Sequence, residues 1–236
     1  MLVVTIRNQI IEMDLDTLNK TIVSCRKCPR LVEYRESVAI KKKRAYQDWA
    51  YWGKPVPAFG DIKGRILVVG LAPGPHGSNR TGRMFTGDAS GVFLFAALYQ
   101  ACFANQPESL NWVDGLKLND MLISAVCRCV PPENKPSRSE ITNCLPYLEQ
   151  EIVLMENLQG FVALGRIAFD NILAIYRAMD VTIPRYDFKH GGVYHLGERL
   201  PWLVASYHPS QQNTQTGRLT VDMFAQIWQK AIMMLV

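Results

Sequence analysis

The sequence lacks the long apolar runs and leader features that mark membrane and exported proteins. No apolar run approaches the roughly 20 residues that a membrane-spanning helix needs, and the longest, such as residues 66–70 and 161–164, are short. The first residues show no basic head followed by an apolar stretch and a small-residue cleavage site, so we expect no secretory signal. These absences predict a cytoplasmic protein without a membrane partner.

Cysteine and histidine are also scarce. Six cysteines in 236 residues are too few for a small disulfide-stapled scaffold, and thiols in the cytosol stay reduced. Four scattered histidines do not suggest a histidine-based metal site. With 48% apolar and 20% charged residues, the chain has the composition of an ordinary globular protein. A net charge of +5 permits an anionic partner such as nucleic acid without requiring one.

The Gly-rich loop over residues 70–91 lacks the signatures of nucleotide binding. It contains no lysine, and therefore no G-x-x-x-x-G-K-[ST] phosphate loop, and no G-x-G-x-x-G follows the preceding strand directly. A phosphate-cradling nucleotidase and a dinucleotide enzyme are therefore disfavoured. The glycines and prolines that the loop does contain are typical of a backbone that approaches a ligand closely and is stiffened elsewhere.

Short apolar runs alternate with helical patterns along the rest of the chain. Strands are predicted over residues 65–70, 121–127, 161–165 and 201–208, and helices over residues 9–24, 92–103, 137–157, 166–178 and 220–235. Ser137 and Glu140 form a capping-box signature, and the helix over 92–103 is apolar almost all round, which predicts deep burial. The alternation predicts a parallel sheet covered on both faces, with a ligand at the carboxyl ends of its strands.

Two polar residues follow strands at that predicted edge. Asp88 precedes a helix, so it fits a helix cap and a catalytic acid equally well. His208 ends the last strand, where histidine can serve as a neutral donor or a proton carrier, or be structural. Arg80 and Arg83 suit solvated loop charges or anion contacts, and Phe85 suits a core position or a stacking surface.

The cysteines suggest a site of another kind. Cys25 and Cys28 form a C-x-x-C pair, while Cys127, Cys129 and Cys144 follow the second predicted strand. Thiolates suit zinc or an iron–sulfur cluster, and this spacing does not separate the two or exclude unrelated buried cysteines. Cys102 lies in the predicted apolar helix and is interpreted as a small core residue.

Seven blocks in order resemble the uracil-DNA glycosylase superfamily, and most closely its family five, the iron–sulfur type B enzymes. The match runs from about Cys25 to the C-terminus through CRKCPRLVEYRE, YWGKPVPAFGD, GLAPGPHGSNRTGRMFTGDASG, DGLKLND, RCVPPENKP, VALG and YHPSQQNTQTGRLT. The resemblance implies one domain over residues 1–236, built as a three-layer α/β/α sandwich with a central four-stranded parallel sheet. It also implies that an N-terminal segment, residues 1–62, is helical or irregular and is tied in by a cluster.

The resemblance assigns roles to individual residues. It implies a structural [4Fe–4S] cluster, with Cys129 favoured over Cys127 because the family's cysteine comes just before x-Pro-Pro. The sister family four has Glu at the position of Leu71 and Asn at that of Ala125, and Gly74-Pro75 replaces an Ala-Ala of family five. The implied sets are the cluster ligands Cys25, Cys28, Cys129 and Cys144, the catalytic residues Asp88, His208 and Asn134, the base-binding residues Gly70, Leu71, Ala72 and Phe85, and the DNA contacts Arg80, Arg83 and Arg218, with residues 41–44 also placed against phosphates.

The implied function is DNA repair. Such an enzyme flips and excises uracil from double-stranded DNA, with a range that extends to hypoxanthine and other deaminated or modified bases, and we expect it to act as a monomer. Three alternatives stay open at this point: a family-four-like enzyme restricted to uracil, a non-catalytic DNA lesion-binding protein, and an iron–sulfur redox protein.

Overall fold

The computed structural model describes residues 14–179 and 181–235, and a sheet of six strands runs through their centre. The four predicted strands are present as a parallel block in the order β3-β2-β4-β6, flanked by β1 and β5, which pair antiparallel to β3 and β6. The bounds are β1 Phe59–Gly60, β2 Ile66–Gly70, β3 Met121–Ala125, β4 Gly160–Leu164, β5 Val193–His195 and β6 Trp202–Ser206. The prediction of a central parallel sheet is confirmed, and the two edge strands are an addition.

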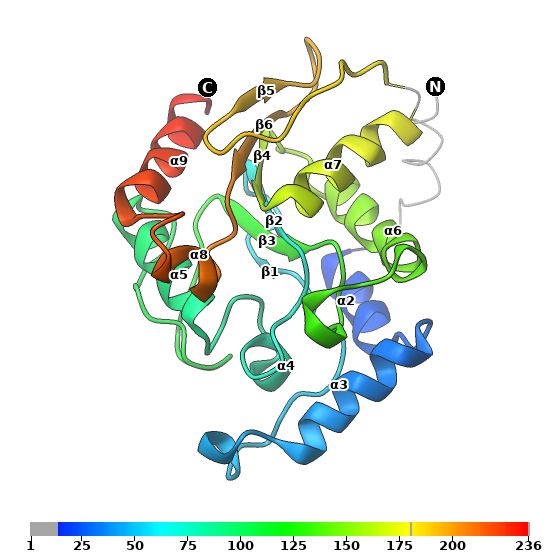
Figure 1. Cartoon of the computed structure of the whole chain (residues 1–236). Coiled ribbons are helices and arrows are strands. Elements are labelled where there is room, and N and C mark those ends of the chain that lie inside the picture. The colour runs from blue at the N-terminus through cyan, green and yellow to red at the C-terminus, as the bar shows by residue number, and fades with distance from the viewer. Residues whose placement is uncertain (1–13, 180, 236) are drawn as a thin grey trace.

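Helices cover both faces of the sheet, as Figure 1 shows. On one face lie α5 (Ala89–Gln100) and α9 (Val221–Met233), and on the other lie α6 (Arg138–Leu154) and α7 (Arg166–Ala178). Successive strand residues alternate between the two cores, so that Ile66 packs toward α5 and α9 while Leu67 packs toward α6 and α7. Every residue of the four parallel strands is buried, which explains their continuously apolar sequences. The three-layer sandwich is therefore confirmed.

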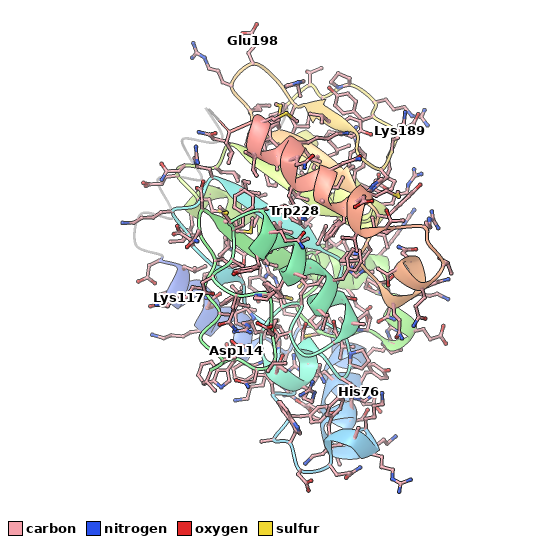
Figure 2. All side chains as sticks on the ribbon, turned by 90° about the vertical axis from the view of Figure 1, so that its left-hand side faces the viewer. His76, Asp114, Lys117, Lys189, Glu198 and Trp228 are labelled. Carbon is pink, nitrogen blue, oxygen red and sulfur yellow. The ribbon has the colours of Figure 1, made fainter. Side chains whose placement is uncertain are left out.

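Figure 2 looks onto the layer that α5 and α9 form. Trp228 of α9 lies within this layer, is 1% exposed, and packs edge-on against Phe224 and Phe103. Phe93 of α5 packs against Phe224, so these rings hold α5 against α9, with the N-terminus of α5 at the carboxyl edge of the sheet. No helix of the described ranges has the length and hydropathy that a membrane crossing requires.

The N-terminal segment holds two helices. The predicted helix over 9–24 appears as α2 (Leu15–Ser24), packed on α6 through Leu18 and Ile22, while positions 9–13 fall outside the described residues. A second helix, α3 (Pro29–Lys41), was not predicted. Its buried face includes the charged Arg35, so its apolar stripe is too narrow to be seen as helical periodicity. A short 3₁₀ turn, η1 (Arg44–Tyr46), follows.

The helix predicted over 92–103 needs two corrections. It spans Ala89–Gln100 and is buried on one face only, because Val92 and Tyr99 are 62% and 48% exposed. Cys102 is an exposed residue beyond the helix, not a core residue within it. Cys102 has φ +61°, donates its N–H to the Tyr99 carbonyl, and is followed by an N–H from Phe103 to the Leu98 carbonyl. This is the hydrogen-bond pattern of a Schellman C-cap, so the helix ends where an apolar sequence alone would continue it.

Candidate active site

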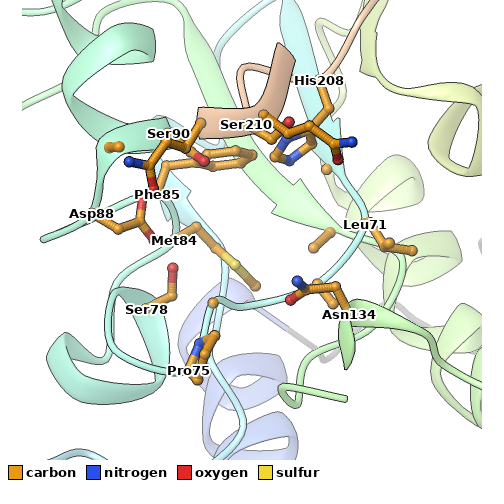
Figure 3. Close-up of a pocket in the computed structure, with 17 residues that line it drawn as sticks. Leu71, Pro75, Ser78, Met84, Phe85, Asp88, Ser90, Asn134, His208 and Ser210 are labelled. Carbon is orange, nitrogen blue, oxygen red and sulfur yellow. The ribbon is translucent and has the colours of Figure 1, made fainter. Parts of the chain in front are cut away.

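A cavity of about 530 Å³ opens at the carboxyl edge of the sheet, where the loops after β2, β3 and β6 meet (Figure 3). A volume of this size holds a small organic ligand. The catalytic and base-binding residues that the sequence predicted all line it, together with several that it did not. The lining residues are Gly70, Leu71, Ala72, Gly74, Pro75, Ser78, Met84, Phe85, Asp88, Ala89, Ser90, Ala125, Asn134, His208, Ser210, Gln211 and Gln212.

Asp88 is both a helix cap and a wall of the cavity. Its Oδ1 accepts the backbone N–H of Gly91 at 3.0 Å, which caps α5, and its side chain lines the cavity beside Ser78 and Ser90. Burial raises the pKa of Asp88, while the N–H groups of Gly91 and Ser90 and the charge of Arg80 oppose that rise. Asp88 therefore caps the helix, and its side chain also lines the space that a ligand would occupy, while its catalytic role stays a prediction.

Phe85 and His208 form a ring pair in the cavity wall. Their ring centroids are 5.8 Å apart with the planes at 30°, and Figure 3 shows the two rings facing the same space. A Cβ on Gly70 would lie 2.7 Å from Cζ of Phe85, so only glycine at the end of β2 lets the ring lie against the strand. Phe85 also has φ +52°, a conformation that non-glycine residues avoid and that occurs at ligand sites. A flat ring held in this way offers a stacking surface for a planar ligand.

His208 is neutral at physiological pH. Burial lowers its pKa to about 4, because the charged imidazolium loses solvation there. The Asn213 side chain donates to the His208 carbonyl at 2.8 Å, which fixes the backbone where β6 passes into α8 (Gln211–Gln215). A neutral imidazole can donate one N–H to a ligand atom without adding charge to the cavity.

The opposite wall carries Asn134 and apolar residues. Asn134 has φ +58° at the end of the 3₁₀ turn η2 (Pro132–Asn134), and Figure 3 shows its amide beside Leu71. Asparagine tolerates this left-handed conformation better than most residues, which suits a loop that aims an amide at a ligand. Leu71 and Ala125 both line the cavity, so no acid occupies the position where the sister family has Glu.

Arg83 does not reach solvent, which argues against the prediction that it contacts phosphate. It is 4% exposed and makes a two-pronged ion pair with Asp114, at 2.8 Å and 2.7 Å. Its Nε donates to the Thr86 hydroxyl, and Nη2 donates to the Ser109 hydroxyl as well as to Asp114. Asp114 also accepts N–H groups from the backbone of its own loop, and, although burial acts to raise it, these bonds lower the pKa of Asp114 to about 2. Arg83 thus joins the Gly-rich loop to the loop around Asp114.

Arg80 is likewise buried, at 3% exposure, so a contact with phosphate would require the residues that cover it to move. Its guanidinium lies between the rings of Tyr46 and Trp49. Of the three predicted arginines, Arg218 is exposed, with its guanidinium 4.6 Å from the centroid of the Tyr207 ring. Lys41, Lys43 and Arg44 of the basic run are exposed as well, at the end of α3. Exposed cations of this kind are available to an anionic polymer.

Four cysteines line a second, small cavity between the N-terminal segment and α6. Cys25 follows α2 and Cys28 precedes α3, and Cys129 and Cys144 complete the set. Cys127 is fully buried and does not line this cavity. No three His, Cys, Asp or Glu side chains of residues 14–179 and 181–235 are placed to hold one metal ion.

Three of the four sulfurs accept hydrogen bonds from nitrogen. Arg35 Nη1 lies 3.0 Å from Cys129 Sγ, the Arg128 backbone nitrogen lies 3.2 Å from Cys144 Sγ, and Asn143 Nδ2 lies 3.6 Å from Cys28 Sγ. Arg35 is 2% exposed, so this cation is buried against the sulfurs. Burial raises the pKa of Cys28, and that of Cys129 to about 11, while the Asn143 amide and the Arg35 cation act in the opposite direction and favour sulfur that carries negative charge.

The polar residues that follow His208 also line the cavity, a position that the sequence did not predict for them. The Ser210 side chain accepts the Asn213 N–H and caps α8, which brings Gln211 and Gln212 to the cavity. Ser210 at the start of an uncharged polar run is an N-cap signal that could have predicted this short helix. Ser78 and Ser90 gave no comparable signal, because serine is common in Gly-rich loops.

Comparison with known proteins places this architecture in a family. The profile of the uracil DNA glycosylase superfamily matches residues 57–232. A type-5 uracil-DNA glycosylase from Thermus thermophilus is 48% identical over 220 residues, which covers 93% of this chain and 97% of that protein. A type-5 enzyme from Pyrobaculum aerophilum is 44% identical, covering 92% and 91%, and a type-4 enzyme from the same organism is 33% identical, covering 84% of each. The chain belongs to the uracil-DNA glycosylase superfamily, within its type-5 group.

Proposed function

We propose that this protein excises uracil from double-stranded DNA by hydrolysing the N-glycosidic bond, the first step of base excision repair. The observation that carries the proposal is the cavity itself, in which a carboxylate, a stacking ring and a neutral histidine face one space of ligand size. A base within a duplex is out of reach of such a cavity, so the target nucleotide has to be flipped into it.

Each wall of the cavity has a role in this proposal. Phe85 stacks on the flipped base, and Gly70, Leu71 and Ala72, with the amide of Asn134, surround its edges. This assignment makes Asn134 the residue that hydrogen-bonds the base and Phe85 the residue that holds its plane. The 5.8 Å approach of Phe85 to His208 supports it, because a base stacked on Phe85 would present an edge to the histidine.

The chemistry follows from where charge develops. As the bond between C1′ and the base breaks, positive charge builds on the sugar and negative charge on the base. The Asp88 carboxylate stabilises the sugar and orients the attacking water, and neutral His208 donates to the O2 of the departing base. The hydroxyl of water adds to C1′, and its proton balances the charge of the released base. An abasic sugar and a free base are the products.

The range of bases is a finer part of the proposal. Leu71 and Ala125 give the wall near β2 and β3 an apolar surface, which has no acid to select one pattern of base edges. We therefore extend the range to hypoxanthine and other deaminated or modified bases. Rejection of unmodified bases then depends on how easily a base flips, since mispaired bases leave the duplex at lower cost.

We also propose that Cys25, Cys28, Cys129 and Cys144 hold a [4Fe–4S] cluster. The residues fit the group: four thiols border one cavity, and three of their sulfurs accept N–H bonds. Each cysteine of such a cluster binds a different iron, so the four sulfurs need not converge on one point. When bound, the cluster supplies a cross-link between the N-terminal segment and the chain around α6, and we assign it no part in bond cleavage.

The DNA partner contacts exposed cations of the protein. Arg218 and the basic run at residues 41–44 are the charges that we place against phosphates. Neutralised phosphates release counterions, so DNA binding weakens as salt rises. We propose that the protein acts as a monomer in the cytoplasm, where the DNA is its nucleic-acid partner.

Base release from defined duplexes tests the function. Duplexes that contain one uracil, one hypoxanthine or only normal pairs are incubated with the protein, and alkali-labile abasic sites are counted. The proposal expects sites at uracil and at hypoxanthine and none in the normal duplex. Sites at uracil alone would restrict the enzyme to uracil, and salt-dependent binding without any sites would identify a non-catalytic lesion-binding protein.

A further inference from the structure

Arg80 lies in the Gly-rich loop, and its side chain is buried. Its guanidinium carbon lies 3.9 Å from the centroid of the Tyr46 ring and 4.0 Å from that of the Trp49 ring. The two rings stand at 78° to each other, so the cation lies in the corner between them, a cation–π arrangement that strengthens as water is excluded. The residue is 3% exposed, although no carboxylate of residues 14–179 and 181–235 forms an ion pair with it.

The side chain of Arg80 forms hydrogen bonds to two distant points of the Gly-rich loop, one of them directly before Asp88. Nε donates to the His76 carbonyl at 2.6 Å, and Nη2 donates to the Gly87 carbonyl at 2.8 Å. Gly87 directly precedes Asp88, and a Cβ there would lie 2.4 Å from Nη2 of Arg80. The backbone next to Asp88 is therefore held against the guanidinium, at a position where only glycine fits.

The cover over Arg80 comes from the N-terminal segment. Tyr46 and Trp49 belong to residues 44–53, which also donate backbone N–H groups from Trp52 to the Arg80 carbonyl and from Gly53 to the Asn79 carbonyl. The Tyr51 hydroxyl lies 2.9 Å from Nδ1 of His76. Residues 44–53 are thus hydrogen-bonded to the Gly-rich loop at His76, Asn79 and Arg80. They cover the Arg80 guanidinium but do not line the cavity.

We propose that Arg80 is a positioning residue that sets the place and ionisation of Asp88, and that Tyr46 and Trp49 keep it in that role by excluding water. The inference rests on the proposed function, in which Asp88 acts as a carboxylate. The positive charge opposes the burial that raises the pKa of Asp88. Of the other titratable groups nearby, His208 lines the same cavity, and burial together with the charges of Lys43 and Arg80 lowers the pKa of His76.

The competing role for Arg80 is a phosphate contact. One nitrogen, Nη1, is buried without a hydrogen-bond partner, so displacement of the rings by DNA would free it for a phosphate oxygen. The two roles predict different measurements. A phosphate contact contributes to DNA affinity and to its salt dependence, with about one unit of slope per phosphate, whereas a positioning residue changes the rate of bond cleavage and its dependence on pH.

The test uses three variants of the full-length protein and one control. Arg80→Gln removes the charge, Arg80→Lys keeps the charge without the planar fork, and Trp49→Leu removes one covering ring. Trp112→Leu is the matched control, because Trp112 is 72% exposed and lines no part of the cavity. Single-turnover uracil release is measured from pH 4 to pH 9, and affinity for a duplex with an abasic-site analogue is measured across a salt series.

The proposal expects Arg80→Gln to slow uracil release at least about tenfold at neutral pH and to move the acid limb of the rate profile upward by about one pH unit. The sign follows because losing the cation raises the pKa of Asp88, so protonation silences the carboxylate at a higher pH. Arg80→Lys should lower the rate with a smaller shift, Trp49→Leu should shift the limb in the same direction, and Trp112→Leu should match the wild type. The salt slope of DNA binding should be unchanged in all four.

Two results would overturn this role. A wild-type pH profile in Arg80→Lys, Arg80→Gln and Trp49→Leu would show that Arg80 does not act on Asp88, even if Asp88 is essential. A salt slope reduced by about one in Arg80→Gln, with an unshifted acid limb, would assign Arg80 to a phosphate. If Arg80→Gln fails to fold, as thermal melting would show, Trp49→Leu carries the same test. Failure of the wild type to release uracil would instead overturn the proposed function.

Discussion

The carboxylate of Asp88 fills the space that a side chain on Gly77 would need. A Cβ at Gly77 would lie 1.9 Å from Oδ2 and 2.6 Å from Cγ of Asp88, while a Cβ at Gly74 would lie 3.0 Å from Oδ2. The Gly-rich loop therefore folds closely around the acid. An alanine at Gly77 would displace the carboxylate strongly, and an alanine at Gly74 would displace it only slightly.

Gly77→Ala should displace Asp88 and slow uracil release about 100-fold, since a small misplacement of a catalytic group has effects of that size. Gly74→Ala should slow it only a few-fold, because a contact of 3.0 Å can be relieved by a slight rotation of the carboxylate. Single-turnover rates of the two variants check this, with thermal melting as the control for folding. Equal rates in Gly77→Ala and the wild type would show that the position of Asp88 does not matter.

His208 should not contribute a titration near pH 6.5, the ordinary value for histidine. Because burial lowers its pKa to about 4, the ring stays neutral across the physiological range and protonates only in acid. His208→Ala should slow release about 100-fold by removing a donor, and His208→Gln should recover part of the loss. Rate profiles of the three proteins decide this. A limb near pH 6.5 in the wild type that His208→Gln abolishes would mean that His208 acts as a proton carrier instead.

The Arg83–Asp114 pair should make stability depend on acid pH. The folded-state pKa of Asp114 is lowered to about 2, so the pair contributes its full stabilisation above the unfolded value near 4 and loses it as the pH falls through 2. The difference corresponds to about 2 kcal/mol. Asp114→Asn should lose roughly 3 kcal/mol at neutral pH, since Arg83 is left buried without its partner, and should lose less stability than the wild type below pH 4. Parallel pH dependences of the two melting temperatures would contradict the linkage.

The parallel sheet was predictable because burial on both faces requires continuous apolar strands, as in Ile66–Gly70. The edge strands were not, because two or three residues show no periodicity and β5 depends on pairing with β6. The end of α5 depends on one left-handed residue, Cys102, in a sequence that stays apolar through Phe103.

The polar residues of the cavity show the same limit. Asp88 and His208 could be placed at one sheet edge because both follow strands in a parallel sheet. The burial of Arg80 and Arg83 could not be predicted, because their partners lie far along the chain, Arg80 among the rings of Tyr46 and Trp49 and Arg83 beside Asp114. Long-range contacts of this kind leave no local pattern in the sequence.

Cys129→Ser should release iron, whereas Cys127→Ser and Cys102→Ser should keep it. Cys129 lines the four-cysteine cavity, Cys127 does not, and Cys102 is exposed elsewhere. Iron and acid-labile sulfide, quantified in each purified variant, check the ligand assignment. Full iron in Cys129→Ser together with loss in Cys127→Ser would exchange the two roles. Bleaching of the visible absorption by mild reductant would favour a redox function over a structural one.

The central claim is that the Asp88 carboxylate drives base release, and the Asp88→Asn substitution tests it most directly. The amide keeps the shape of the side chain but cannot carry the negative charge that stabilises the sugar cation. Asp222→Asn, on an exposed acid in the first turn of α9, is the control. In single-turnover assays on a duplex with one uracil, we predict a loss of at least about 100-fold in Asp88→Asn, with normal binding to the duplex and wild-type rates in the control. Uracil release by Asp88→Asn at the wild-type rate would contradict this account.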